Sequence, residues 1–201
     1  MFKLLLVCFI AAAALAVVYL AARAAYRVLK VKLDAYLLYR GERVVVCPET
    51  RQYVAVEVDA AYAAATATEE ETALRLSSCT RWPERAGCDQ DCVYQIANAP
   101  EDCAVRTMLE DFYEGRSCVL CSKPLAGPRR DEHKPALLRA YDRRTFECRE
   151  LPPEALPVVL DAYLPVCWDC HVAESFRREH PDLVTDRDSK PAACGHVSLT
   201  T

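Results

Sequence analysis

The chain begins with one uninterrupted apolar run. From Leu4 to Ala22 there are 19 residues without a charge, which at 1.5 Å per residue span roughly the ~30 Å hydrocarbon core of a bilayer. The residues that follow, up to Arg40, keep a helical pattern without a break. We therefore expect residues 1–40 to form a transmembrane anchor and a juxtamembrane helix. A cleaved secretory signal peptide is the alternative, because small residues at 21–25 could offer a cleavage site.

Beyond residue 40 the pattern changes to short strands and short helices, which predicts an α+β domain over residues 41–187. β-Favouring runs bounded by turn residues predict strands, at 44–46, 53–58, 73–76, 136–141 and 145–149. Helical apolar spacing or an alanine-rich composition predicts helices, at 60–67, 89–97, 104–114, 153–162 and 170–179. The last residues, 188–201, are expected to form a flexible tail.

Basic residues are distributed unequally around the apolar run. One precedes the run and four follow it closely: Lys3 before it, and Arg23, Arg27, Lys30 and Lys32 after it. Flanking Lys and Arg stay on the cytoplasmic side of a membrane. This bias predicts a single-pass protein of a bacterial inner membrane, with its C-terminal domain in the cytoplasm.

Net charge and cysteine content limit which partners and ligands are expected for this domain. Residues 1–40 hold six of the 25 basic and one of the 29 acidic residues, so the rest has 19 basic and 28 acidic residues and a formal charge of −9. Such a charge repels phosphate, and nucleic acid is not an expected partner. The chain also contains 12 cysteines, and in a reducing cytoplasm closely spaced cysteines indicate metal ligands rather than disulfides.

Two C-x-x-C pairs carry the strongest chemical signal. They are Cys118-Val119-Leu120-Cys121 and Cys167-Trp168-Asp169-Cys170, with 45 residues between them. Two residues between thiolates let one turn point both sulfurs at one ion, and two such turns complete the tetrahedral four-sulfur set that zinc prefers. The sequence therefore predicts a zinc site whose ligands are Cys118, Cys121, Cys167 and Cys170. The alternative is a set of unrelated buried or disulfide-bonded cysteines.

The stretches SCVLCSKPL and CWDCHVAESF, with a predicted hairpin between them, resemble the treble-clef or zinc-ribbon-like class of four-cysteine zinc fingers. In the first stretch a turn with two cysteines is followed by Lys123-Pro124 and an apolar residue, and in the second the cysteines precede a helix. The resemblance covers about residues 117–180 and implies a zinc module there. The segment 150–165 is longer than the compact pattern of that class.

The second pair also belongs to a C-x-x-C-H sequence, the attachment motif of c-type haem. In that alternative Cys167 and Cys170 bind the haem vinyl groups, His171 ligates the iron, and the protein carries electrons. Haem attachment requires an extracytoplasmic domain, which the charge bias disfavours, and it gives Cys118 and Cys121 no role. A further alternative is a thiol redox protein that uses Cys167 and Cys170 as its redox pair.

A second group of cysteines lies earlier in the chain, at Cys79, Cys88, Cys92 and Cys103. Cys88 and Cys92 lie one helical turn apart if a helix begins near residue 89. The four sulfurs could bind a second zinc ion or an iron–sulfur cluster, or form two disulfides if the domain lies outside the cytoplasm. Cys47, in the predicted turn at 47–50, is an alternative member of this group.

Segments from CPET at 47–50 to PVCWDCHVAESFRREHPDLV at 165–184 resemble an uncharacterised family of bacterial membrane-anchored cysteine-rich proteins, over most of residues 45–187. The resemblance implies no activity. The sequence contains no G-x-S-x-G, phosphate-binding glycine loop or H-E-x-x-H, and an enzyme is not expected. We expect a membrane-anchored zinc-binding protein with a structural or interaction role and a protein partner.

Overall fold

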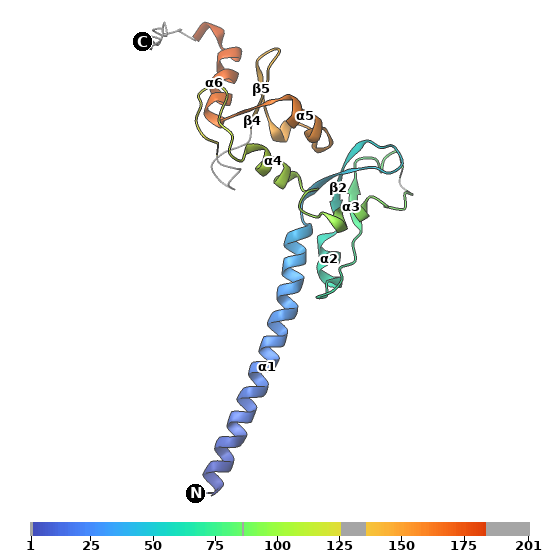
Figure 1. Ribbon diagram of the computed structural model, residues 1–201, viewed down its shortest axis with the longest axis vertical. Coiled ribbons are helices and arrows are strands. Elements are labelled where there is room, and N and C mark those ends of the chain that lie inside the picture. The colour runs from blue at the N-terminus through green and yellow to red at the C-terminus, as the bar shows by residue number, and fades with distance from the viewer. Residues whose placement is uncertain (1, 86, 126–135, 184–201) are drawn as a thin grey trace, which may run out of the picture.

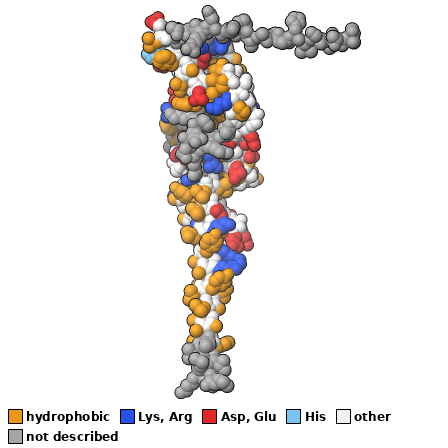
Figure 2. All heavy atoms as spheres, turned by 90° about the vertical axis from the view of Figure 1, so that its left-hand side faces the viewer, with side chains coloured by type: hydrophobic (Ala, Val, Ile, Leu, Met, Phe, Trp, Pro, Cys, Tyr) orange, Lys and Arg blue, Asp and Glu red, His pale blue; other side chains and the backbone are white. Residues whose placement is uncertain are grey.

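The long N-terminal helix is the most extended element of the structure. The computed structural model describes residues 2–85, 87–125 and 136–183, with only the backbone described for residues 2–8. α1 (Phe2–Tyr39) is one unbroken helix of 38 residues. Figure 1 shows its N-terminal part standing clear of the other labelled elements, and Figure 2 shows mainly hydrophobic side chains along it. The helix is long and apolar enough to cross a membrane, which agrees with the predicted anchor.

The N-terminal lobe, as we call it, consists of the last turns of α1, a three-stranded sheet and two short helices. The sheet has the order β1 (Glu42–Val46), β2 (Tyr53–Val58) and β3 (Leu76–Cys79), and its neighbours are antiparallel. The first two strands confirm the predicted hairpin around Cys47. The third strand begins at Leu76, where its pairing with Val58 starts, rather than at residue 73.

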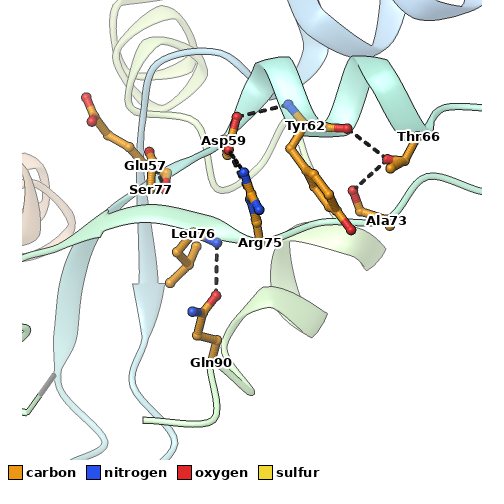
Figure 3. A network of polar contacts seen from close by, with 9 residues as sticks. All are labelled: Glu57, Asp59, Tyr62, Thr66, Ala73, Arg75, Leu76, Ser77 and Gln90. Atoms are coloured by element: carbon orange, nitrogen blue, oxygen red, sulfur yellow. Dashed lines mark hydrogen bonds and ion pairs between the residues drawn. The ribbon is translucent and has the colours of Figure 1, made fainter. Parts of the chain in front are cut away.

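The helix α2 (Ala60–Thr66) is fixed to the sheet by a polar network around Asp59 (Figure 3). One carboxylate oxygen of Asp59 accepts a hydrogen bond from the amide of Tyr62 at 2.9 Å, which caps the helix. The other oxygen pairs with the guanidinium of Arg75 at 2.6 Å. This guanidinium also lies over the Tyr62 ring, 4.2 Å from its centroid. One carboxylate thus holds both the start of α2 and the segment that leads into β3.

The core of the N-terminal lobe includes the end of α1. Ala35 and Tyr39 are buried among apolar residues of the sheet and of α2, and α1 packs along α2. Arg43, which is 1% exposed, donates hydrogen bonds to the carbonyls of Leu38 and Pro100. The helix predicted to form the anchor therefore continues into the folded domain without a linker.

The C-terminal lobe begins with α4 (Val105–Tyr113), which confirms the predicted amphipathic helix and is followed by Gly115 at a φ of +66°. Its antiparallel sheet has the order β5-β4-β6, and the β4–β5 pair confirms the second predicted hairpin. The strands are β4 (Ala136–Arg139), β5 (Arg144–Glu147) and β6 (Leu164–Val166). The helical elements are η1 (Cys148–Glu150), η2 (Pro153–Ala155), α5 (Leu156–Ala162), α6 (Trp168–Glu179) and η3 (Pro181–Leu183).

The helices α3 (Val93–Asn98) and α6 begin at least two residues away from their predicted starts. α3 starts later than residue 89, because Gln90 has a φ of +59° and its side chain accepts a hydrogen bond from the amide of Leu76. The prediction that Cys88 and Cys92 lie one helical turn apart is therefore wrong. α6 begins two residues earlier than predicted. The tail predicted for 188–201 lies outside the described residues.

Candidate metal centre

The four cysteines of the two C-x-x-C pairs meet in the C-terminal lobe. Their sulfur atoms all lie within 4.8 Å of one another, and the sulfurs of Cys121 and Cys167 are 3.7 Å apart. Cys118 and Cys167 are buried, Cys170 is half-buried and Cys121 is exposed. The group therefore has an apolar inner side and one ligand open to solvent, and it can hold a metal ion.

The first pair lies in a tight turn at residues 118–123, which we call the C-terminal knuckle. The amide of Cys118 donates to the carbonyl of Lys123 at 2.9 Å, and the amide of Ser122 donates to the carbonyl of Cys118 at 2.8 Å. Ser122 has a φ of +60°. The amide of Val119 donates to the carbonyl of Pro165 at 3.1 Å, which attaches the knuckle to β6.

The second pair lies where β6 passes into α6. Cys167 is the N-cap residue of α6 in an extended conformation, and Cys170 lies in the first turn of the helix. Pairing of β6 with the buried strand β4 fixes the position of Cys167. Lys123 of the C-terminal knuckle forms an ion pair with Asp169 at 3.4 Å, so the two turns also contact each other outside the sulfur group.

Hydrogen bonds to sulfur prepare the group for a cation. Burial tends to raise the pKa of the Cys118 thiol, but the backbone amides of Cys167, Cys121 and Leu120 outweigh it and lower the pKa to about 6. The pKa of Cys170 is raised, first by burial and then by the neighbouring sulfurs. Several thiolates so close together repel one another, and a divalent cation removes this repulsion.

His171 follows the second pair directly and is 8% exposed. Its ring lies 5.1 Å from that of Trp168, and its Nδ1 has no hydrogen-bond partner among the described residues. Burial lowers its pKa, and this effect outweighs the opposing charges of Glu147 and Glu150. The imidazole thus packs from the first turn of α6 into the lobe, directly after Cys170, and it is not one of the four ligands.

The second predicted group is only partly brought together. Cys79, Cys88 and Cys92 line one cavity in the N-terminal lobe, and the fourth cysteine at this cavity is Cys47. Cys103 lies elsewhere, beside Arg43, whose charge acts on it. Burial raises the pKa of Cys92 to about 11, with smaller contributions from Cys79, Cys88 and Cys47. Outside the C-terminal lobe, no described group of three or more ligand atoms is assembled as closely.

Comparison of the chain with protein-family models, with curated proteins and with solved structures finds no match.

Proposed function

We propose that this protein is a membrane-anchored zinc-binding protein whose domain has a structural and interaction role at the cytoplasmic face of a bacterial inner membrane. The observation that carries the proposal is the four-sulfur group, to which two distant turns contribute two cysteines each. Paired C-x-x-C turns with buried inner ligands are typical of structural zinc sites.

The sulfur spacing supports zinc as the ion. Zinc–sulfur bonds are about 2.3 Å long, so neighbouring sulfurs in a tetrahedral four-thiolate site lie about 3.8 Å apart. The 3.7 Å between Cys121 and Cys167 agrees with this value, and the other distances are below 4.8 Å. An iron–sulfur cluster needs wider spacing, because several metal and sulfide atoms lie between the thiolates.

The same geometry favours a metal ion over haem c and over a thiol redox pair. In the haem alternative Cys167 and Cys170 bond to a porphyrin edge and His171 reaches the iron. Here their sulfurs face the C-terminal knuckle, and His171 is buried. A redox pair needs an accessible attacking thiolate, whereas Cys167 is 8% exposed.

The order of elements supports the treble-clef interpretation. The C-terminal knuckle is followed by the β4–β5 hairpin, then by β6, and then by α6 with the second pair at its start. Among the described residues, the buried apolar cluster next to the cysteines contains Leu138 and Val166 besides Cys118 and Cys167, and only partly buried side chains pack against it. A structural zinc ion can contribute on the order of 10 kcal/mol to folding, which a small core does not supply by itself.

The charge distribution supports the proposed location and partner class. The four basic residues after the apolar run favour a cytoplasmic domain, where thiols stay reduced and available to zinc. The formal charge of −9 beyond residue 40 disfavours nucleic acid. We therefore propose a protein partner, which the domain binds close to the membrane.

The test is metal analysis of the full chain in detergent micelles, together with its absorbance spectrum. We expect zinc without a Soret band, and the double variant Cys118→Ser/Cys121→Ser should lose one equivalent of zinc per chain. Cys103→Ser is the matched control, because Cys103 lies outside both cysteine groups of the structure, and it should keep all of the zinc. Covalent haem, or zinc content that the double variant leaves unchanged, would refute the proposal.

A further inference from the structure

The turn between β1 and β2 repeats the hydrogen bonds of the C-terminal knuckle. In residues 47–52 the amide of Cys47 donates to the carbonyl of Gln52 at 2.8 Å, and the amide of Arg51 donates to the carbonyl of Cys47 at 2.8 Å. The same two bonds, with the same residue separations, close the turn at 118–123. Arg51 has a φ of +57° and the equivalent Ser122 a φ of +60°. We call residues 47–52 the N-terminal knuckle.

The two knuckles also surround their sulfur atoms in the same way. Burial tends to raise the pKa of Cys47, but the amides of Thr50 and Glu49, three and two residues after it, together with the Thr50 hydroxyl and Arg81, lower it to about 7. The amides of Leu120 and Cys121 hold the equivalent positions around the sulfur of Cys118. Amides directed at sulfur in this pattern stabilise a thiolate that ligates a metal. The difference is that Thr50 stands where the C-terminal knuckle has its second cysteine.

Three further cysteines surround the N-terminal knuckle. Cys47 lines a cavity of about 50 Å³ together with Cys79, Cys88 and Cys92, which come from the end of β3 and from the segment before α3. Cys47 and Cys92 are buried, and Cys79 and Cys88 are half-buried. Four thiols from three chain segments thus border one small space inside the N-terminal lobe.

The other lining residues fit a thiolate site. Arg81 donates to the sulfur of Cys47 at 2.9 Å and to the carboxylate of Glu49 at 3.2 Å. Trp82 lines the same cavity, and its indole Nε1 is buried without a hydrogen-bond partner among the described residues. A buried N–H without an acceptor is costly, and a metal-bound thiolate supplies such an acceptor.

We propose that Cys47, Cys79, Cys88 and Cys92 bind a second soft divalent cation of the zinc class, with the N-terminal knuckle as the first part of the site. Without a cation, Arg81 compensates the charge at Cys47. Cys88 lies in a segment without helix or strand, so it is the ligand that can move to close the site. Binding moves no electrons, and each thiol that ligates the ion releases a proton.

Zinc content and cobalt(II) spectra of single-site variants test this proposal. Purified full-length chain in micelles should bind two equivalents, and Cys118→Ser/Cys121→Ser should keep one. Cys88→Ser should lower the metal affinity of the second site more than about 100-fold. Loss of a residue that only hydrogen-bonds to a ligand already lowers metal affinity 10–100-fold, and Cys88 is proposed as a ligand itself. Cys103→Ser, the matched control, should keep two equivalents and the full thiolate-to-cobalt absorbance.

The outcomes separate this site from the first one. The wild-type chain could bind only one equivalent of zinc. If Cys118→Ser/Cys121→Ser loses this equivalent and Cys88→Ser keeps it, the second site is overturned and the proposed function stands. If the single equivalent of zinc is instead lost in Cys88→Ser and kept in Cys118→Ser/Cys121→Ser, the proposed function is overturned. Iron with visible cluster absorbance in the N-terminal lobe, or disulfides among these four cysteines in protein purified under reducing conditions, also overturns the proposal.

The N-terminal knuckle lacks the second cysteine of the C-terminal knuckle, and adding it gives a second test. A gain of zinc binding cannot result from unfolding of the variant. Thr50→Cys places a thiol at the position equivalent to Cys121. The double variant Thr50→Cys/Cys88→Ser should regain the second equivalent of zinc that Cys88→Ser loses, when both variants compete for zinc with one and the same chelator. A double variant that binds no more tightly than Cys88→Ser contradicts the equivalence of the two knuckles on which the site is built.

Discussion

The sulfurs of Cys121 and Cys167 lie 3.7 Å apart, although 45 residues lie between them in the chain. The β4–β5 hairpin and β6 fill this interval, and the pairing of β6 with β4 brings Cys167 to the C-terminal knuckle. A metal ion bound at this point would join the C-terminal knuckle, which precedes the C-terminal sheet, to the start of α6. Removing it should therefore affect the lobe as a unit.

Cys167→Ser should destabilise the C-terminal lobe strongly, because Cys167 is a buried member of the sulfur group. Losing even about 3 kcal/mol of the zinc contribution lowers the unfolding midpoint by roughly 10 °C in a domain of this size. Differential scanning fluorimetry with and without a chelator measures this effect. The chelator should lower the midpoint of the wild type more than that of the variant, which keeps only the site proposed in the N-terminal lobe; equal responses would contradict the prediction.

Hydrogen exchange should show where the metal acts. In Cys118→Ser/Cys121→Ser, amide exchange should become at least about tenfold faster over 116–125 and 164–171, where backbone bonds connect the C-terminal knuckle to β6. Amides of β2 lie in the other sheet and should keep their rates. Equal acceleration in both lobes would mean that the metal stabilises the whole domain rather than one part.

Arg43→Met should destabilise the N-terminal lobe by about 2–4 kcal/mol, because the carbonyls of Leu38 and Pro100 lose their donor. Arg43→Lys should recover less than half, since an ammonium group cannot reproduce the planar fork of the guanidinium. Urea unfolding gives both values. Arg40→Met is the matched control, because Arg40 is exposed, and it should change stability by less than about 0.5 kcal/mol.

Asp59→Ala should lower the unfolding midpoint by about 2–4 °C at neutral pH, the effect of losing a helix cap in a domain of this size. The amide of Tyr62 and then Arg75 lower the pKa of Asp59 below its ordinary value of 3.8. The stabilisation is therefore complete above that pH and is lost as the pH falls below it. The midpoint difference from wild type should shrink accordingly, and Asp59→Asn, which keeps an acceptor without the charge, should lie between the two.

Membrane orientation should depend on the basic residues after the apolar run. A C-terminal alkaline phosphatase fusion should be inactive and a C-terminal fluorescent protein fusion active when the domain is cytoplasmic. Replacing Arg23, Arg27 and Lys30 by Gln, with two lysines added after Met1, should raise phosphatase activity, because the charge bias is then reversed. Phosphatase activity in the wild-type fusion would place the domain outside the cytoplasm and contradict the predicted orientation.

The two halves of the first cysteine site could be predicted because the geometry of each C-x-x-C turn is local. A C-x-x-C turn directs two sulfurs to one point whatever surrounds it, and the sequence between the pairs shows the hairpin that closes the gap. The metal itself is not encoded in the same way, since other ions also accept four thiolates.

The cysteines of the N-terminal lobe could not be grouped correctly from spacing. Cys103 is close to Cys92 in sequence, yet its carbonyl accepts a hydrogen bond from the amide of Val44 and its side chain lies beside Arg43. Cys47 joins Cys79 instead because β2 pairs with β3, a non-local contact. Thr50 also conceals the knuckle, since the sequence there shows only one cysteine.

The unbroken continuation of α1 into the lobe would determine the orientation of the domain relative to a membrane that α1 crosses. From residue 23 to residue 30, between the apolar run and the first packed turn, the helix rises about 12 Å. That spacer is helical and lacks the freedom of a flexible tether. In a membrane, a tilt or rotation of the helix would therefore rotate the attached lobe by the same angle. A membrane protein that binds the helix would then also change the orientation of the lobe.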